Sequence, residues 1–400
     1  MTRLAPTRHS PVMHIRSVTP IPVTYPLARE PMSFCFVRVE TDSGLVGWGE
    51  ACDSYGCSYA GVLATAITDA FAPMLVGREF TSPGQLAELL RIATRRRLGD
   101  AWVAVQARSA VEIALWDVAA QQSGTSVTDL IGRVRDRVAV YASSSFLEEG
   151  PAEYHLDLVA PLLERGVRFV KVRTGPEWQR DIVTLTRLRE LLDDDIELMI
   201  DGSETYTLPT AVEIAARLAA IGVRWFEEPV PQGAQEAIRS LCSRSAVPIA
   251  YGEHLYGVGE TVQALGTNGV SVLQPDASTS GGIGPARSMA EVAAHYGARV
   301  VPHVCAGPVS LAANLALAGT VPGIRLIEYP VHLAPAWGGL GVGAGLGIAA
   351  IEDGTIEIPD GPGLGVSLAE TVAAEHPYQR PQGRVAGTVG GLPDRFAGDR

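Results

Sequence analysis

Short apolar runs alternate with helix-like segments from Arg137 onward. In residues 209–221, Ile214, Leu218 and Ile221 recur with the period of an amphipathic helix. The apolar runs follow one another at about 25 residues, the rhythm of β/α units. About eight of them are strand candidates: 138–142, 169–173, 197–201, 224–228, 247–251, 270–274, 299–302 and 325–328. Such a succession predicts an α/β protein with a TIM-type barrel. An open doubly wound sheet is the alternative, disfavoured because no G-x-G-x-x-G follows a first strand.

The first 130 residues have a different pattern. Residues 34–40 and 45–50 are rich in β-forming side chains, and the turn 42–44 (Asp-Ser-Gly) between them signals a hairpin. Ala, Leu, Ile and Arg dominate residues 60–130, where 110–116 lies inside a long helical pattern. We therefore expect a small sheet and then a helical bundle ahead of the barrel. Residues 1–12 are expected to form a loose leader, and the Pro-, Gly- and Arg-rich stretch 378–400 a poorly ordered tail.

Composition narrows the classes of function. The chain has 400 residues, enough for a barrel and a smaller domain, and its net charge of -12 argues against binding nucleic acid or anionic membranes. Five cysteines without a C-x-x-C pair suggest neither a disulfide framework nor a zinc site. The N-terminus lacks the apolar core of a signal peptide, and no stretch approaches the roughly 18 apolar residues of a membrane helix. A reduced, cytoplasmic setting is therefore expected.

Three acids follow consecutive strand candidates: Asp201, Glu227 and Glu253, each 26 residues from the next. In a barrel of this type the chemistry lies at the carboxyl ends of the strands, so these side chains should converge. Converging carboxylates repel one another, and a divalent cation relieves the repulsion. Oxygen ligands alone favour Mg²⁺. The alternative is that the acids are solvated loop residues, which an equal interval makes less favourable.

Two basic residues lie on another predicted strand, 169–173. Lys171 and Arg173 are two residues apart and so point to the same side. If Phe169, or Val170 and Val172, face the helices, both cations face the barrel interior, either for chemistry or in a structural salt bridge. Lys171 is the single lysine beside 31 arginines, so charge alone does not explain why it is a lysine.

A histidine and an acid lie at the ends of two later strands. His303 follows 299–302, and Asp276 follows the strand before it. An Asp bonded to one imidazole nitrogen raises the basicity of the other, which would make His303 a general base. Glu328 lies on the last predicted strand.

Taken in order, these residues resemble the enolase superfamily, in particular its mandelate racemase-like branch. The resemblance covers almost the whole chain and rests on these segments: 47–50 (GWGE), 114–117 (ALWD), 171–173 (KVR), 201–203 (DGS), 227–229 (EEP), 252–253 (GE), 274–276 (QPD), 302–303 (PH) and 362–365 (PGLG). It implies a modified (β/α)₇β barrel over 136–335 and an α+β capping domain over 13–135. Residues 336–377 would return to that capping domain and complete it.

The resemblance also implies a reaction. Mg²⁺ would be held by Asp201, Glu227 and Glu253, and the proton α to a carboxylate would be removed to give a metal-stabilised enediolate. The base in this branch is a His–Asp dyad, which corresponds to His303 and Asp276. Glu328 corresponds to the acid that hydrogen-bonds the substrate carboxylate and the enediolate.

Two positions depart from the family pattern. Arg173 replaces the usual second lysine, a base, and arginine stays protonated at neutral pH. Ser203 replaces a common Asn, and together with His254 it should contact the substrate. A one-base reaction is therefore favoured: loss of water from a sugar acid or hydroxy acid to give a 2-keto acid.

Other reactions and partners complete the expectations. The alternatives are a racemase or epimerase that uses Lys171 as its second base, and a non-catalytic metal-binding barrel. A muconate-type cycloisomerase is less favoured, because no lysine lies near Asp276. The expected partners are a small-molecule carboxylate and further copies of the chain in a homo-oligomer. Loops around 20–31 and 50–60 should set specificity.

Overall fold

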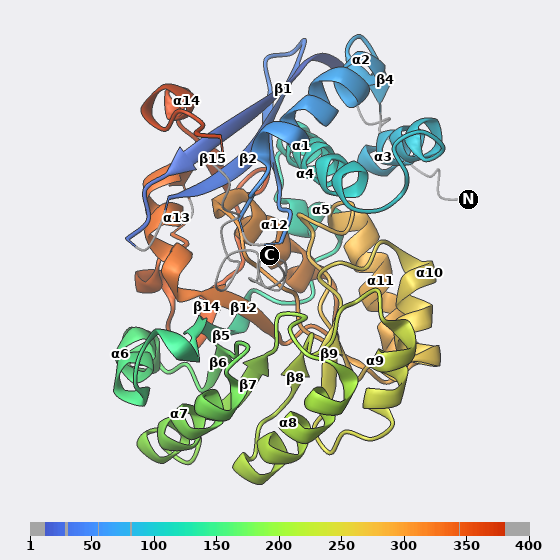
Figure 1. Ribbon diagram of the computed structural model, residues 1–400. Helices are drawn as coiled ribbons and strands as arrows, with labels where there is room; N and C mark the ends of the chain where they lie inside the picture. The colour runs from blue at the N-terminus through green and yellow to red at the C-terminus, as the bar shows by residue number, and fades with distance from the viewer. Residues whose placement is uncertain (1–12, 29–30, 55, 81, 344, 381–400) are drawn as a thin grey trace, which may run out of the picture.

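The structure, a computed structural model, describes residues 13–28, 31–54, 56–80, 82–343 and 345–380. The expected leader at 1–12, and all of the expected tail beyond residue 380, lie outside the described residues. An antiparallel sheet with its helices lies on one end of a barrel of parallel strands (Figure 1). The predicted fold class, a modified (β/α)₇β barrel with an α+β N-terminal domain, is confirmed.

The N-terminal sheet is antiparallel and has the strand order β3-β2-β1-β4. Its strands are β1 (Met13–Tyr25), β2 (Met32–Thr41), β3 (Val46–Ala51) and β4 (Glu79–Phe80). The predicted hairpin is confirmed, because β2 and β3 pair with Arg38 opposite Trp48. The accompanying helices are α1 (Ala60–Ala66), α2 (Ala72–Leu75), α3 (Pro83–Thr94), α4 (Val103–Ser123) and α5 (Val127–Ile131), with a π-helical turn (Ile67–Phe71) between α1 and α2.

Close contact between α4 and β3 explains two glycines of the Gly-Trp-Gly segment. A Cβ atom at Gly49 would lie 1.7 Å from the carbonyl oxygen of Ala110, and one at Gly47 would lie 2.2 Å from that of Ala114. Only glycine allows the helix backbone to approach the strand this closely. The pair of glycines therefore sets the distance at which the main helix of the N-terminal domain packs on its sheet.

Eight parallel strands form the barrel in the order β11-β10-β9-β8-β7-β6-β5-β12. They are β5 (Arg137–Phe146), β6 (Phe169–Arg173), β7 (Glu197–Asp201), β8 (Phe226–Glu227), β9 (Ile249–Tyr251), β10 (Val272–Leu273), β11 (Arg299–Val300) and β12 (Leu326–Pro330). A single parallel bridge between Val300 and Ile324 nearly closes the ring. All eight predicted strands are present, but 224–228, 270–274 and 299–302 shorten to two residues each, and β8 ends where the backbone of Glu228 turns left-handed (φ 37°).

Helices connect the strands and cover the outside of the barrel (Figure 1). They are α6 (Ala152–Leu163), α7 (Trp178–Leu191), α8 (Leu208–Ile221), α9 (Gln235–Cys242), α10 (Val258–Val262) with a π-helical turn (Gln263–Thr267), α11 (Ile283–His295) and α12 (Pro308–Thr320). The helix predicted at 209–221 is α8, and it buries Ile214 and Leu218. Short 3₁₀ turns occur at Leu147–Glu149, Val331–Leu333 and Ile348–Ala350.

Alternation along β6 separates the inside of the barrel from the outside. Val170 and Val172 belong to the apolar layer under the helices, whereas Tyr141, Met199 and Trp225 belong to the small core within the barrel. Lys171 and Arg173 are buried on the interior side, as the two-residue period predicted.

The chain after the barrel runs back to the N-terminal sheet. Its elements are α13 (Ala334–Leu340), β13 (Gly341–Gly343), β14 (Thr355–Glu357), β15 (Val366–Leu368) and α14 (Val372–Glu375). β14 pairs with β5, β13 pairs with β15, and Thr24 N donates to His376 O at 3.2 Å. The last described residues therefore lie along β1.

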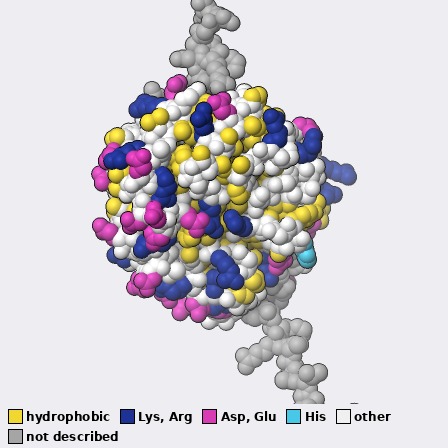
Figure 2. Space-filling view, turned by 90° about the horizontal axis from the view of Figure 1, so that it is seen from below, with side chains coloured by type: hydrophobic (Ala, Val, Ile, Leu, Met, Phe, Trp, Pro, Cys, Tyr) yellow, Lys and Arg dark blue, Asp and Glu magenta, His cyan; other side chains and the backbone are white. Residues whose placement is uncertain are grey.

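The molecular surface carries charges of both signs. On the face seen from below Figure 1, acidic and basic side chains alternate, with apolar side chains between them (Figure 2). None of the helices in the described ranges combines the length and apolar character that a membrane crossing requires.

Candidate active site

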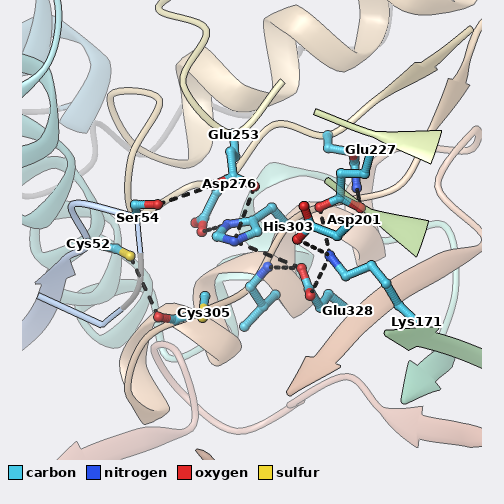
Figure 3. Close-up of polar contacts among 12 residues, drawn as sticks. Cys52, Ser54, Lys171, Asp201, Glu227, Glu253, Asp276, His303, Cys305 and Glu328 are labelled. Carbon is cyan, nitrogen blue, oxygen red and sulfur yellow. Dashed lines mark hydrogen bonds and ion pairs between the residues drawn. The ribbon is translucent and has the colours of Figure 1, made fainter. Parts of the chain in front are cut away.

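A row of charged side chains crosses four neighbouring strands at their carboxyl ends. Arg173 of β6 lies opposite Asp201 of β7, and Asp201 lies opposite Glu227 of β8. Glu253 follows β9, and all four residues are at most 8% exposed. The register of a parallel sheet therefore brings the predicted acids to one end of the barrel, the end that faces the N-terminal domain (Figures 1 and 3).

Lys171 lies at the centre of the acidic group. Its Nζ is 2.6 Å from Glu227 Oε1, 2.9 Å from Glu328 Oε1 and 3.8 Å from Asp201 Oδ2. Burial opposes the charged form, but these carboxylates outweigh it and hold the pKa of Lys171 well above its ordinary value. In this arrangement Lys171 is a buried ammonium that forms ion pairs with three acids.

Arg173 pairs with a different oxygen set. Its Nε donates to Asp201 Oδ2 at 3.0 Å, and an Nη donates to the carbonyl of Ser144 at 3.2 Å. The two cations of β6 thus divide the acids between them: Lys171 holds Glu227 and Glu328, and Arg173 holds Asp201.

The predicted dyad is present in geometry. His303 Nδ1 lies 2.9 Å from Asp276 Oδ2, and the other oxygen of Asp276 accepts from Ser278 and Asn314. His303 Nε2 lies 3.5 Å from Glu253 Oε2 and 4.0 Å from Glu328 Oε2 (Figure 3). Burial opposes the charged imidazole, but Glu253 and Asp276 raise the pKa of His303 well above its ordinary value.

The pKa values of Glu328 and Glu227 are shifted in opposite directions, although both carboxyls contact Lys171. Burial opposes the charged form of Glu328, yet Lys171 and His303 lower the pKa of this carboxyl below its ordinary value. For Glu227, burial together with Asp201 and Glu328 outweighs Lys171 and raises the pKa to about 7. Neighbouring carboxyl groups whose pKa values are shifted in opposite directions are typical of acid–base sites.

A cavity of about 180 Å³ opens beside this group. It is lined by Ser54, Phe146, Arg173, Asp201, Ser203, Glu204, Glu228, Glu253, His254, His303 and Cys305. Lys171 and Glu227 lie behind this lining. The predicted substrate contacts Ser203 and His254 both border the cavity, but Ser203 donates its N–H and hydroxyl to Asp201 Oδ1 at 2.7 and 3.1 Å.

The sequence interpretation missed two acids of the cavity wall, Glu204 and Glu228. Glu228 is adjacent to Glu227, and alternation along a strand would point two neighbouring side chains to opposite sides. The backbone is left-handed at Glu204 (φ 56°) and at Glu228 (φ 37°), and Glu204 N donates to Glu228 O at 2.7 Å. Such dihedrals are uncommon outside glycine and lack a sequence signal here; the doubled Glu of 227–229 is the one hint.

The N-terminal domain reaches this site through its own polar contacts. Ser54 Oγ lies 3.4 Å from Glu253 Oε1, and Cys52 Sγ lies 3.7 Å from Cys305 O (Figure 3). Glu50, the last residue of the GWGE segment, accepts hydrogen bonds from Gly307 N and Ser310 N at the start of α12. The segment 47–50 therefore connects the N-terminal domain to the barrel next to the candidate active site.

A divalent cation fits the donors that converge here. The acids present hard oxygen atoms, and burial and mutual repulsion raise the pKa of Glu227, Glu228 and Glu253. Among the described residues, ligand atoms of Glu228, Glu253 and His254 lie within 4.8 Å of one another. Asp201 and Glu227 are instead held by Arg173 and Lys171.

The fold and these contacts define a barrel protein with a buried acid–base centre under a capping domain. Residues 12–132 match the mandelate racemase / muconate lactonizing enzyme N-terminal domain, and residues 156–372 match the enolase C-terminal domain-like family. The chain therefore belongs to the mandelate racemase/muconate lactonizing enzyme family of the enolase superfamily.

Curated relatives in this family are named for reactions of acid sugars. A D-galactarolactone cycloisomerase of Agrobacterium fabrum is 30% identical over 347 residues, which cover 85% of this chain and 90% of the relative. An arabinonate dehydratase of Saccharolobus solfataricus is 28% identical, with 88% and 92% covered. An L-talarate/galactarate dehydratase of Salmonella typhimurium is 31% identical, with 68% and 66% covered.

Solved structures agree with the fold. A mandelate racemase/muconate lactonizing enzyme from Bordetella bronchiseptica has a TM-score of 0.81 and 28% identity, covering 91% of this chain and 99% of that one. A related protein from Paracoccus denitrificans, complexed with magnesium, has a TM-score of 0.80 and 25% identity, with 91% and 97% covered.

Proposed function

We propose that this protein is a Mg²⁺-dependent dehydratase that converts a sugar acid or related hydroxy acid into a 2-keto acid. One observation carries the proposal: His303, paired with Asp276, borders the cavity together with Arg173, which comes from β6 on the other side of the barrel. A histidine can accept a proton at neutral pH, whereas an arginine stays protonated. The site therefore favours a reaction that needs one base.

We assign the metal to Asp201, Glu227 and Glu253. When bound, the cation supplies the positive charge that stabilises the second negative charge developing on the substrate carboxylate. Lys171 and Gln274 already hold the oxygens of Glu227, at 2.6 and 2.7 Å. Trp225 Nε1 also donates to Glu227 Oε2 at 3.4 Å, so Glu227 is oriented while its Oε1 keeps a further lone pair.

His303 and Asp276 perform the proton transfer. Asp276 holds the Nδ1–H, so Nε2 is the atom that accepts the proton from the α-carbon. The largest influence raising the pKa of His303 is Glu253. If a metal ion held by Glu253 offset the charge of this carboxylate, the pKa of His303 would fall back toward the range of a useful base. Glu328 lies at the same end of the barrel and, in its protonated form, would donate a hydrogen bond to the substrate carboxylate.

Water loss completes the reaction without a second base. The α C–H bond breaks and its electron pair forms a carbon–carbon double bond, while the β-hydroxyl leaves with the proton from His303 as water. The resulting enol then becomes the 2-keto acid. Arg173 stays a cation throughout and offsets the negative charge beside Asp201.

A racemase or epimerase is the second candidate, because Lys171 is buried at the reacting end on a different strand from His303. Its ammonium, however, is engaged by Glu227 and Glu328 and its pKa is raised, which disfavours the neutral amine that a base requires.

The test is incubation of the Mg²⁺-loaded protein with a panel of sugar acids in D₂O. A dehydratase gives semicarbazide-reactive 2-keto acids, and His303→Asn abolishes them. Deuterium at the α-carbon of recovered substrate, without water loss, would instead support the racemase. Turnover of no acid in a broad panel would contradict both. His295→Asn, on the outer helix α11, is the matched control.

A further inference from the structure

We propose that the site accepts sugar acids with one carboxylate and rejects those that carry a carboxylate at both ends. This inference rests on the proposed function, because it concerns the far end of the same substrate. It follows from the acidic wall of the cavity, by which we mean Glu204 and Glu228.

The acidic wall remains after the reacting groups are assigned. Four carboxylates border the cavity, and two of them, Asp201 and Glu253, belong to the proposed metal site. Glu204 and Glu228 are not among the ligands proposed for the metal, although ligand atoms of Glu228, Glu253 and His254 lie within 4.8 Å of one another. Glu228 is 4% exposed, and its Oε1 accepts no hydrogen bond from the described residues. A buried acceptor of this kind needs a donor.

The donor that suits this wall is a hydroxyl group. Glu204 Oε1 accepts from Gln232 N at 2.6 Å, and the left-handed backbone at both acids holds their side chains at the cavity. A polyol chain supplies several O–H groups that can donate to carboxylate oxygens. A carboxylate has no proton to donate, and it would bring like charge against like charge.

A second carboxylate also finds no spare cation among the described residues that border the cavity. Arg173 is engaged by Asp201 and the carbonyl of Ser144. The chain's single lysine lies behind the wall, bonded to Glu227 and Glu328. His254 Nδ1 lies 3.9 Å from both Glu228 and Glu253, so any charge on this ring is already balanced.

The experiment compares acids that differ only at the far end. D-galactonate and galactarate share the configuration from C2 to C5, and C6 is a hydroxymethyl group in the first and a carboxylate in the second. With the Mg²⁺-loaded enzyme we expect kcat/KM for such monoacids to exceed that for the matched diacids by about 100-fold or more. Several matched pairs should be used, because the preferred stereochemistry is a separate question.

Two variants test the cause. Glu204→Gln and Glu228→Gln keep the shape and one acceptor oxygen but remove the charge, and each should narrow the monoacid-to-diacid ratio at least about tenfold. Glu236→Gln is the matched control, because it removes the same charge from the exposed side of α9. It should leave the ratio unchanged.

A binding measurement separates this inference from the proposed function. Calorimetric titration of the His303→Asn protein with Mg²⁺ and each acid reports selectivity without turnover. If no acid is converted or exchanged but monoacids still bind more tightly, the proposed function fails and this inference stands. Equal or tighter binding of the diacids would overturn it. An unchanged monoacid-to-diacid ratio of kcat/KM in both folded variants, Glu204→Gln and Glu228→Gln, would also overturn it. Diacid preference would also indicate that a second cation neutralises the wall.

Discussion

The substitution Arg173→Lys restores the usual second lysine of the family and should open a second face of the substrate to proton exchange. At pH 8 a lysine of ordinary pKa is neutral in about 0.4% of molecules, and an arginine in at most about 0.003%. Asp201, 3.0 Å from Arg173 Nε, favours the charged form of either side chain. The neutral base should therefore become roughly 100-fold more abundant.

The same change has a structural cost. A lysine cannot keep both the bond to Asp201 and the bond to the carbonyl of Ser144, and losing a hydrogen bond to a charged group costs about 1.5–3 kcal/mol. We expect the variant to remain folded but to unfold at a lower denaturant concentration. Thermal and urea unfolding, each with Mg²⁺ present, would measure this.

Proton NMR of recovered substrate in D₂O measures the exchange, and the 2-keto acid is measured separately. Arg173→Lys should gain α-deuteration that persists in the double variant with His303→Asn, because the new base does not depend on the dyad. Arg173→Gln is the matched control and should gain none. If the folded Arg173→Lys protein exchanges no faster than the wild type, then the arginine is not what limits this protein to one base.

Three further predictions concern stability and charge. Lys171→Met leaves buried carboxylates without their cation, so the free energy of unfolding should fall by roughly 3–5 kcal/mol in urea; if Lys171→Arg retains full activity, the position needs only charge. Gly49→Ala forces a methyl group onto the backbone of α4 and should cost about 1–3 kcal/mol or more, whereas Gly233→Ala, with open space around it, should be near neutral in the same measurement. Burial raises the pKa of Glu50 from 4.5 to about 8, so the folded chain holds a proton that the unfolded chain loses, and stability should fall as pH rises between these values. Glu50→Gln should flatten that dependence in urea midpoints taken at pH 5 and pH 8, and an unchanged slope would contradict it.

Spacing was enough to find three acids, Asp201, Glu227 and Glu253, and the two cations of β6. A parallel β/α barrel repeats its strand ends at regular intervals, so acids 26 residues apart must fall on neighbouring strands. A strand alternates its faces, so Lys171 and Arg173 had to share one side once Val170 and Val172 faced the helices. The position of His303 after one strand and Asp276 after another predicted a pairing that the structure contains at 2.9 Å.

Other features depended on backbone turns that leave no pattern in the sequence. Glu228 should have pointed away from the site by strand alternation, yet its left-handed backbone brings it to the cavity. Ser203, expected to contact the substrate, borders the cavity with a left-handed backbone (φ 46°), and its N–H and hydroxyl donate to Asp201 Oδ1. The direction of such side chains is set by local dihedrals and by contacts between distant segments.

The sequence by itself therefore determined the barrel, the order of its strands and the residue types at their ends, because these follow from periodicities of two, 3.6 and about 25 residues. Only the tertiary structure decided which acid each cation holds, how the N-terminal domain joins the barrel through Glu50, and that two unassigned carboxylates line the cavity. The physical reason is the separation along the chain over which each property is set. Periodicity is a local property of the chain, whereas the charge that a substrate meets is summed over residues that the fold brings together from distant strands and loops.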